Sequence, residues 1–248
     1  MKRLFWYVLI GVVLFSLVLS GCGPKAEKIR VATDATWPPF ESVNEQTKEI
    51  EGFDIDLIKA IAEKEGLEIE IVNVAWDPLL AGVAQCQYDM AISSISITED
   101  RAKEMLFSDP YFQVGQLVTV HIDNTDIKSK DNLAGKVAGA QIGTTGSFAI
   151  EKIEGATLKT YDDIGLAFQD LINGAIDAVV SDNPLAYGYV GRNPDKLKTV
   201  GEVFTSEDIG IAVCKDNPDL LKKINSGLKA VKAEGLIEQL IDKWLVGE

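Results

Sequence analysis

The sequence predicts an α/β protein with two lobes and a ligand-binding cleft between them, and three observations support this. The 248 residues are 46% hydrophobic and 25% charged, which is the balance of a folded globular protein. Segments with a two-residue apolar period alternate along the chain with segments of helical period, as in α/β layers. The alternation starts again after residues 113–115, which makes two units of roughly a hundred residues each, and small molecules commonly bind between such units.

The N-terminus has the features of a secretion signal. A basic start precedes an apolar run over residues 4–19, which is shorter than the roughly 20 residues that a membrane-spanning helix needs. The run ends in Leu-Ser-Gly-Cys22, which resembles the lipobox of bacterial lipoproteins, where the chain is cut before the cysteine and its sulfur takes a diacylglyceryl group. We therefore predict a signal peptide over residues 1–21 and a lipid-anchored tether over 22–27, outside the cytoplasmic membrane or in a periplasm. The alternative is an uncleaved anchor helix.

The first series of elements follows this tether. The β-branched residues of Lys28–Thr33 predict a strand, and the two prolines within Asp34–Phe40 predict a loop. Apolar residues at helical spacing predict a helix over Phe53–Glu65, which ends at Gly66. The next expected elements are a strand over Leu67–Val74, a helix around Pro78–Gln85 and a short strand over Met90–Ile92.

The second series repeats the same alternation without any internal sequence repeat. Its expected strands are Leu117–His121, Val137–Ala140 and Ala178–Ser181, and its expected helices lie near Ser147–Ile153 and Asp163–Asn173. An apolar strand over Ile209–Cys214 and two closing helices, Leu220–Glu234 and Leu236–Trp244, complete the chain. Because strands alternate with helices, each sheet is expected to be largely parallel.

Composition excludes several functions. The net charge is −14 and the isoelectric point about 4.6, whereas nucleic-acid binding needs a basic surface. One histidine, His121, and three cysteines are too few for a zinc site of histidines and cysteines, so we expect no metal and no cofactor. Cys86 and Cys214 fall near the ends of predicted elements, and the pattern leaves open a disulfide or two buried thiols.

Six short motifs stand in a characteristic order. They are Trp37–Phe40, Gly52–Leu57, Ser93–Arg101, Phe107–Tyr111, Gly143–Ser147 and Asp177–Asp182. Together they resemble the solute-binding proteins that deliver polar amino acids to ABC importers, and the resemblance covers about residues 28–246. One departure is Glu65, at a position that this family usually fills with an apolar or small residue.

The resemblance implies a periplasmic-binding-protein fold of type II, with two lobes and two hinge strands. The first lobe would comprise residues 28–112 and 210–248, the second lobe 117–205, and the linkers 113–116 and 206–209. Lobes of this kind close around a ligand by hinge bending, and the permease of the importer recognises the closed form. A monomer is expected.

The resemblance also implies how the cleft holds a free amino acid. Arg101 would bind the carboxylate through two charge-assisted hydrogen bonds, completed by the backbone N–H groups of Ser96 and Thr145. Asp182, the Ser96 hydroxyl and the Ser94 carbonyl would surround the ammonium group. The structural alternatives are a solvated surface arginine and an aspartate that caps a helix.

The side chain of the amino acid would lie between Trp37 and Phe53, which are otherwise core residues. At the far end Asp34 would supply a carboxylate beside Ser93 and Gln141, and a carboxylate near aromatic rings suits a cation. Glutamine-binding relatives carry a lysine at the position of Gln141, and such a lysine would repel a basic side chain. Glutamate would need a second cation at the far end of the pocket, and none is expected there. A basic amino acid (arginine, lysine or histidine) is therefore the first expectation and glutamine the second.

An enzyme of the same fold is the main rival function. Some members of the superfamily are cyclohexadienyl or arogenate dehydratases, which carry a general acid three residues after the position of Asp182. Leu185 stands there and cannot donate a proton. We also find neither a G-x-S-x-G motif nor a Cys–His pair, so the sequence predicts a binding protein rather than an enzyme. A ligand-sensing partner of a receptor would share the same fold and site.

Overall fold

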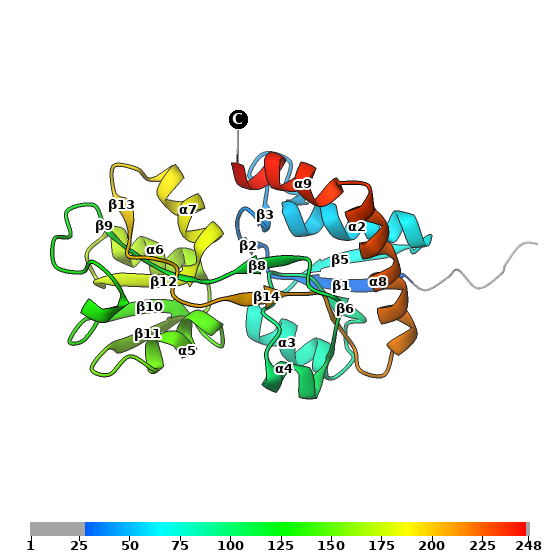
Figure 1. Cartoon of the computed structure of the whole chain (residues 1–248), viewed down its shortest axis with the longest axis horizontal. Helices are drawn as coiled ribbons and strands as arrows, with labels where there is room; N and C mark the ends of the chain where they lie inside the picture. The colour runs from blue at the N-terminus through cyan, green and yellow to red at the C-terminus, as the bar shows by residue number, and fades with distance from the viewer. Residues whose placement is uncertain (1–27, 247–248) are drawn as a thin grey trace, which may run out of the picture.

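The computed structural model describes residues 28–246, which form two lobes (Figure 1). The first lobe, drawn mainly in blue, cyan and red, contains both ends of the described chain, and the second lobe, mainly green and yellow, comes from its middle. Each lobe contains a five-stranded sheet packed against helices. The two-lobed α/β fold that the sequence predicts is confirmed.

The first lobe contains one large and one small sheet. The strands of the large sheet are β1 (Ile29–Thr33), β5 (Ile69–Asn73), β6 (Met90–Ala91), β7 (Leu106–Phe107) and β15 (Ala212–Val213). The small sheet is formed by β2 (Thr36–Trp37), β3 (Glu41–Val43) and β4 (Ile50–Glu51). The helices are α2 (Phe53–Glu65), α3 (Trp76–Ala84), α4 (Glu99–Glu104), α8 (Pro218–Ala233), α9 (Leu236–Ile241) and the π-helix η2 (Asp242–Val246). In the large sheet the strand order is β5-β1-β6-β15-β7.

The second lobe has the strand order β11-β10-β12-β9-β13. These strands are β9 (Gln116–His121), β10 (Val137–Gln141), β11 (Thr157–Tyr161), β12 (Ala178–Asp182) and β13 (Leu197–Val200). The helices are η1 (Lys130–Asn132), α5 (Thr145–Glu151), α6 (Ile164–Ile172) and α7 (Asn183–Arg192).

Two strands, β8 (Phe112–Val114) and β14 (Glu207–Ile209), connect the lobes and lie between them in Figure 1. They pair antiparallel, with Glu207 opposite Val114 and Ile209 opposite Phe112. The linkers expected at 113–116 and 206–209 fall on or beside this pair. Because so few strands join the lobes, the fold permits a hinge motion about them.

The sheets differ from the largely parallel ones that we expected. In each five-stranded sheet two strand pairs are parallel and two are antiparallel. The antiparallel pairs all involve the strand that enters each lobe from the hinge: β9 pairs with β12 and β13, and β15 pairs with β6 and β7. The strand expected over Ile209–Cys214 is accordingly divided between β14 and β15. The elements that were not anticipated are the helices η1, α4 and α7 and the strands β2, β3, β4, β7, β11 and β13. Strand β2 lies in the expected loop.

The conformation of Gly52 explains how α2 begins where it does. Its φ is 141°, and an added Cβ would lie 2.1 Å from the carbonyl oxygen of Phe40, so only glycine fits this close approach. Helix α2 then buries Phe53, Leu57 and other apolar residues completely against the core, where it packs on α8. This packing fixes the wall of the first lobe behind the cleft.

Cys86 and Cys214 form a disulfide, which resolves the alternative that the sequence left open. Their Cα atoms are 5.0 Å apart although the residues are separated by 128 positions in sequence. In the chain-entropy model a cross-link over a loop of this size stabilises the folded state by about 5 kcal/mol. The bond therefore holds the returning C-terminal part of the first lobe to its N-terminal part.

Within residues 28–246, no helix is both long and apolar enough to cross a membrane. The predicted signal peptide, Cys22 and the tether lie outside the described residues.

Candidate functional site

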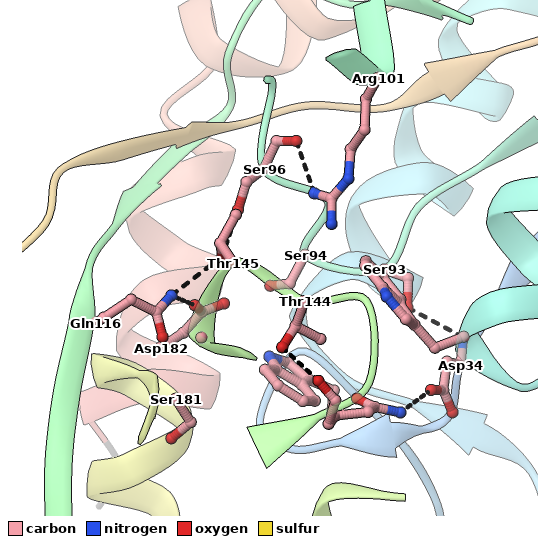
Figure 2. A pocket seen from close by; sticks show the side chains of 14 residues that line it. Asp34, Ser93, Ser94, Ser96, Arg101, Gln116, Thr144, Thr145, Ser181 and Asp182 are labelled. Carbon is pink, nitrogen blue, oxygen red and sulfur yellow. Dashed lines mark hydrogen bonds between the residues drawn. The ribbon is translucent and has the colours of Figure 1, made fainter. Parts of the chain in front are cut away.

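A narrow pocket lies between the two lobes (Figure 2). It is lined by Asp34, Trp37, Trp76, Ser93, Ser94, Ser96, Arg101, Gln116, Gln141, Thr144, Thr145, Gly146, Ser181 and Asp182. Every ligand-binding residue that we predicted from the sequence lies here except Phe53. Most of them stand at or just after the carboxyl ends of β1, β6, β10 and β12, because the ends of parallel strands meet along one edge of a sheet.

Arg101, on α4, provides the positive charge of the pocket. Its Nη1 donates to the Ser96 carbonyl at 2.9 Å and its Nη2 to the Gly143 carbonyl of the other lobe at 3.2 Å. The guanidinium carbon lies 5.2 Å from the centre of the Trp76 ring, within range of a cation–π contact. Burial lowers the pKa of Arg101 from its ordinary value, and nearby carboxylates act in the opposite direction. Arg101 is thus a half-buried, oriented cation rather than a solvated surface residue.

Gly143 allows the lobes to approach each other beside this arginine. Its φ is 68°, a left-handed conformation that glycine adopts without strain, and an added Cβ would lie 2.8 Å from Asp77 Oδ1. Thr144 caps the following helix α5 by accepting a hydrogen bond from Ser147 N, and Thr145 is the first residue of that helix. The Thr145 hydroxyl comes within 3.5 Å of the Ser96 hydroxyl across the cleft.

Asp182, at the end of β12, is one of two carboxylates in the pocket. Its Oδ1 accepts a hydrogen bond of 2.7 Å from Gln116 Nε2, and only 4% of the residue is exposed. It stands at the N-cap position of α7, but its side chain makes no capping hydrogen bond. Burial, followed by repulsion from Glu207, raises the pKa of Asp182 to about 7. The carboxylate therefore faces the pocket without an ion-pair partner that offsets its desolvation.

Asp34 is the second carboxylate and follows β1. Gln141 Nε2 of the other lobe donates to its Oδ2 at 2.8 Å, and Thr36 Oγ1 donates to its Oδ1 at 3.0 Å. The residue is buried, and this burial raises the pKa of Asp34 despite the two hydrogen bonds. The far end of the pocket therefore favours a ligand group that brings a positive charge.

A buried network of acids fixes the serines behind Asp34. Ser93 Oγ accepts from Asp34 N at 3.0 Å and donates to Glu41 Oε1 at 2.8 Å. Asp54 accepts hydrogen bonds of 2.8 Å from Ser94 N and from the Tyr111 hydroxyl. Burial raises the pKa of Asp54 to about 6 and that of Glu41 well above its usual range. These bonds hold Ser94 at a φ of 47°, a conformation that is uncommon for residues other than glycine.

Phe53 is not part of the pocket lining. It is fully buried, and its ring centre lies 5.7 Å from that of Phe40 and 6.2 Å from that of Tyr111. The aromatic residues that line the pocket are Trp37, as predicted, and Trp76, which we did not predict. Trp76 begins α3 just after β5, and its position after a strand end was the signal that sequence reasoning passed over.

The other lining residues that we did not predict are Gln116, Thr144, Gly146 and Ser181. Gln116 is the first residue of β9, where the chain enters the second lobe, and Glu207 on β14 contacts both Gln116 and Ser96. No motif marks these positions, because their role depends on how the hinge brings the lobes together. Leu185, which replaces the general acid of the dehydratases, is fully buried and does not line the pocket.

Three charges of the pocket lie apart from one another. Figure 2 shows Arg101, Asp182 and Asp34 at three separate positions around the pocket, with polar serines and threonines between them. Such an arrangement is complementary to a small molecule that carries both negative and positive groups. Two lobes, two hinge strands and a charged pocket in the cleft together define a solute-binding protein.

The family follows from the comparison with known proteins. The model of the bacterial extracellular solute-binding proteins, family 3, matches residues 29–247, and the chain belongs to this family. It is 36% identical over 225 residues to the ABC transporter arginine-binding protein 1 of Escherichia coli, covering 88% of this chain and 91% of that protein.

Solved structures agree with this assignment. An ancestral arginine-binding protein bound to arginine matches with a TM-score of 0.84 and 42% identity, covering 88% of this chain and 97% of that chain. The arginine-, lysine-, histidine-binding protein ArtJ of Geobacillus stearothermophilus matches with a TM-score of 0.84 and 38% identity, covering 90% of this chain and 96% of that chain.

Proposed function

We propose that this protein binds a free amino acid with a cationic side chain, arginine first, and delivers it to an ABC importer by hinge closure. The observation that carries the proposal is the set of three separated charges in the pocket. Arg101 would receive the α-carboxylate, Asp182 the α-ammonium and Asp34 the side-chain cation. Ser96, Ser94 and Thr145 would complete the first two contacts, and Trp37 and Trp76 would flank the side chain.

Glutamine is the second candidate, and Asp34 argues against it. A neutral amide would leave a buried carboxylate without a counter-charge, and burial already raises the pKa of Asp34. A guanidinium or ammonium group would instead form a buried ion pair with it. Relatives named for binding arginine, lysine or histidine support a basic amino acid. An ancestral arginine-binding protein bound to glutamine, 42% identical to this chain, keeps glutamine as the second candidate.

A thermal-shift screen of residues 26–248 against the twenty amino acids and ornithine tests this function. A ligand that binds only the folded state stabilises it by roughly 2.7 kcal/mol at a hundredfold excess over Kd, which raises the Tm. We expect the largest shifts with arginine, lysine or ornithine. A shift with glutamine alone would contradict the role given to Asp34. If no amino acid shifts the Tm, the dehydratase or sensor alternatives are favoured. Turnover of prephenate or arogenate would then be assayed.

The lipid anchor is a further part of the proposal and rests on the sequence around Cys22. Two acyl chains hold a protein stably on a membrane, so the binding protein would remain close to its permease outside the cell. We expect Cys22→Ser to move the protein from the membrane fraction to the soluble fraction, measured by cell fractionation. A variant that still sediments with membranes would contradict the anchor.

A further inference from the structure

We propose that Glu207, on the hinge strand β14, is a positioning residue that makes the ammonium end of the pocket accept hydrogen bonds rather than donate them. The inference rests on the proposed function, because it concerns the subsite that would hold the α-ammonium group. Glu207 does not line the pocket itself and acts through two residues that do, Ser96 and Gln116.

The side chain of Glu207 accepts hydrogen bonds from residues of both lobes. Ser96 Oγ of the first lobe donates to its Oε2 at 2.7 Å. Thr205 Oγ1 donates to its Oε1 at 2.7 Å, and Gln116 Nε2 of the second lobe approaches the same oxygen at 3.2 Å. Burial raises the pKa of Glu207, but these hydrogen bonds outweigh it and the net shift is downward, so the group is an anion at neutral pH.

The polarity of Ser96 follows from this contact. A hydroxyl group has a single hydrogen to donate, and Ser96 gives it to Glu207. Only the lone pairs of Ser96 Oγ are then left for the pocket. Those lone pairs can accept a hydrogen bond from an ammonium group. An ammonium group donates three hydrogen bonds and accepts none, so it needs acceptors around it.

The amide of Gln116 is oriented in the same way. Its NH2 group lies against three acceptors: Asp182 at 2.7 Å, the Thr145 hydroxyl at 3.1 Å and Glu207 at 3.2 Å. The amide oxygen Oε1 therefore points elsewhere, and among the described residues it is buried without a hydrogen-bond partner. A neutral amide at position 207 would present donors as well as acceptors and would no longer impose this orientation.

The place of Glu207 links this polarity to the hinge. The backbone of Ser96 forms a β-bridge with Ile209, and Gln116 follows β8, the partner of β14, by two residues. Glu207 thus lies where the two lobes and both connecting strands meet. An opening of the hinge would separate Ser96 from Gln116. The Glu207 carboxylate can therefore contact both side chains only in the closed form.

Glu207 also changes the proton affinity of Asp182. Burial raises the pKa of Asp182 to about 7, and repulsion from Glu207 contributes to this rise. The positive charge of Arg101 acts in the opposite direction. An incoming ammonium group requires the ionised form of Asp182. The affinity for an α-amino acid is therefore expected to fall as the pH drops below about 7, by up to tenfold per pH unit.

Calorimetric titration of wild-type protein and Glu207→Gln with two ligands tests the proposal. L-arginine carries the α-ammonium group, and 5-guanidinopentanoate is the same molecule without it. We expect Glu207→Gln to weaken L-arginine by about 10- to 100-fold, the value of a misoriented hydrogen bond to a charged group. The affinity for 5-guanidinopentanoate is expected to change less than about threefold, because its binding does not use this subsite. Asp208→Asn is the matched control: it removes the same charge from the next, exposed residue of the strand and should leave both affinities unchanged.

The pH profile separates positioning from a merely structural role. In Glu207→Gln the repulsion on Asp182 is lost, so the pH below which L-arginine binding weakens should move to a lower value than in the wild type. Glu207→Gln should weaken L-arginine binding less in a Ser96→Ala variant than in the wild type, because the hydroxyl that Glu207 orients is then absent.

Equal fold losses for the two ligands, together with an unmoved pH profile, would overturn the role of Glu207. This result differs from a failure of the proposed function, in which the wild type itself binds no amino acid. If the wild type prefers glutamine, L-glutamine and 4-carbamoylbutanoate serve as the corresponding pair, because the α-ammonium group is common to all amino acids.

Discussion

Replacing Arg101 with alanine is expected to weaken the binding of every amino acid by roughly 30- to 5,000-fold. Truncation of one partner of a buried, hydrogen-bonded charge pair typically costs about 2–5 kcal/mol or more, and the α-carboxylate would lose its only cation among the lining residues. The loss should be equal for arginine and glutamine, because both share the carboxylate. Titration calorimetry with both ligands measures it.

A lysine variant shows whether binding depends on the two parallel hydrogen bonds of the Arg101 guanidinium or only on its charge. Arg101→Lys keeps a positive charge but cannot form two parallel hydrogen bonds, so its affinity should lie between those of the wild type and the alanine variant. Arg192→Ala is the control, since Arg192 is exposed on α7 and outside the pocket. An affinity of Arg101→Ala within tenfold of the wild type would contradict the carboxylate assignment. The Tm of each variant without ligand distinguishes lost binding from lost folding.

Much of the pocket was predicted from the sequence because its short motifs resemble those of amino-acid-binding proteins. Asp34 follows the first strand, Asp182 ends another and Arg101 lies in a serine-rich motif. Asp34 and Asp182 are polar where an apolar strand stops, whereas Arg101 lies further along the chain, on helix α4. The ends of parallel strands converge on one edge of a sheet. Periodicity and strand ends do not by themselves distinguish a binding arginine from a solvated surface residue, so the resemblance was needed to place Arg101 in the predicted site.

The residues that sequence reasoning missed depend on contacts between distant segments. Glu207 and Gln116 are ordinary polar residues in sequence, and they acquire a role only because the two hinge strands bring them beside Ser96. Phe53 shows the opposite case. It sits in a strong motif, yet the rings of Phe40 and Tyr111 hold it in the core. Packing of this kind is decided by the whole lobe, so a motif alone does not determine which face of a residue meets the ligand.

The mixed direction of the sheets has a similar origin. Periodicity identified most strands of the two five-stranded sheets, but it carries no information about their direction. The chain leaves the first lobe after β7 and returns at β15, and the hinge strands set the direction of the strands that follow them. A single pass along the sequence predicts elements better than it predicts connections of such long range.

Asp34→Asn is expected to weaken arginine and lysine by about 30- to 1,000-fold while glutamine changes less than about threefold. The wild-type carboxylate would pair with the cationic side chain in a buried place, whereas asparagine offers only a neutral oxygen. Glutamine has no such charge to lose. It would instead be relieved of a buried carboxylate without a counter-charge, which can offset the disturbed hydrogen bonds from Gln141 and Thr36.

The ratio of the two affinities is the informative quantity, because it cancels any general effect of the substitution on folding or closure. Asp195→Asn, which removes an exposed carboxylate outside the pocket, should leave that ratio unchanged and controls for the change in net charge. Equal losses for arginine and glutamine would mean that Asp34 serves to hold Gln141 of the opposite lobe rather than to select a cation. In that case the preference for a basic amino acid would have to arise from Trp37 and Trp76 alone, and two aromatic faces without a carboxylate discriminate a cation only weakly.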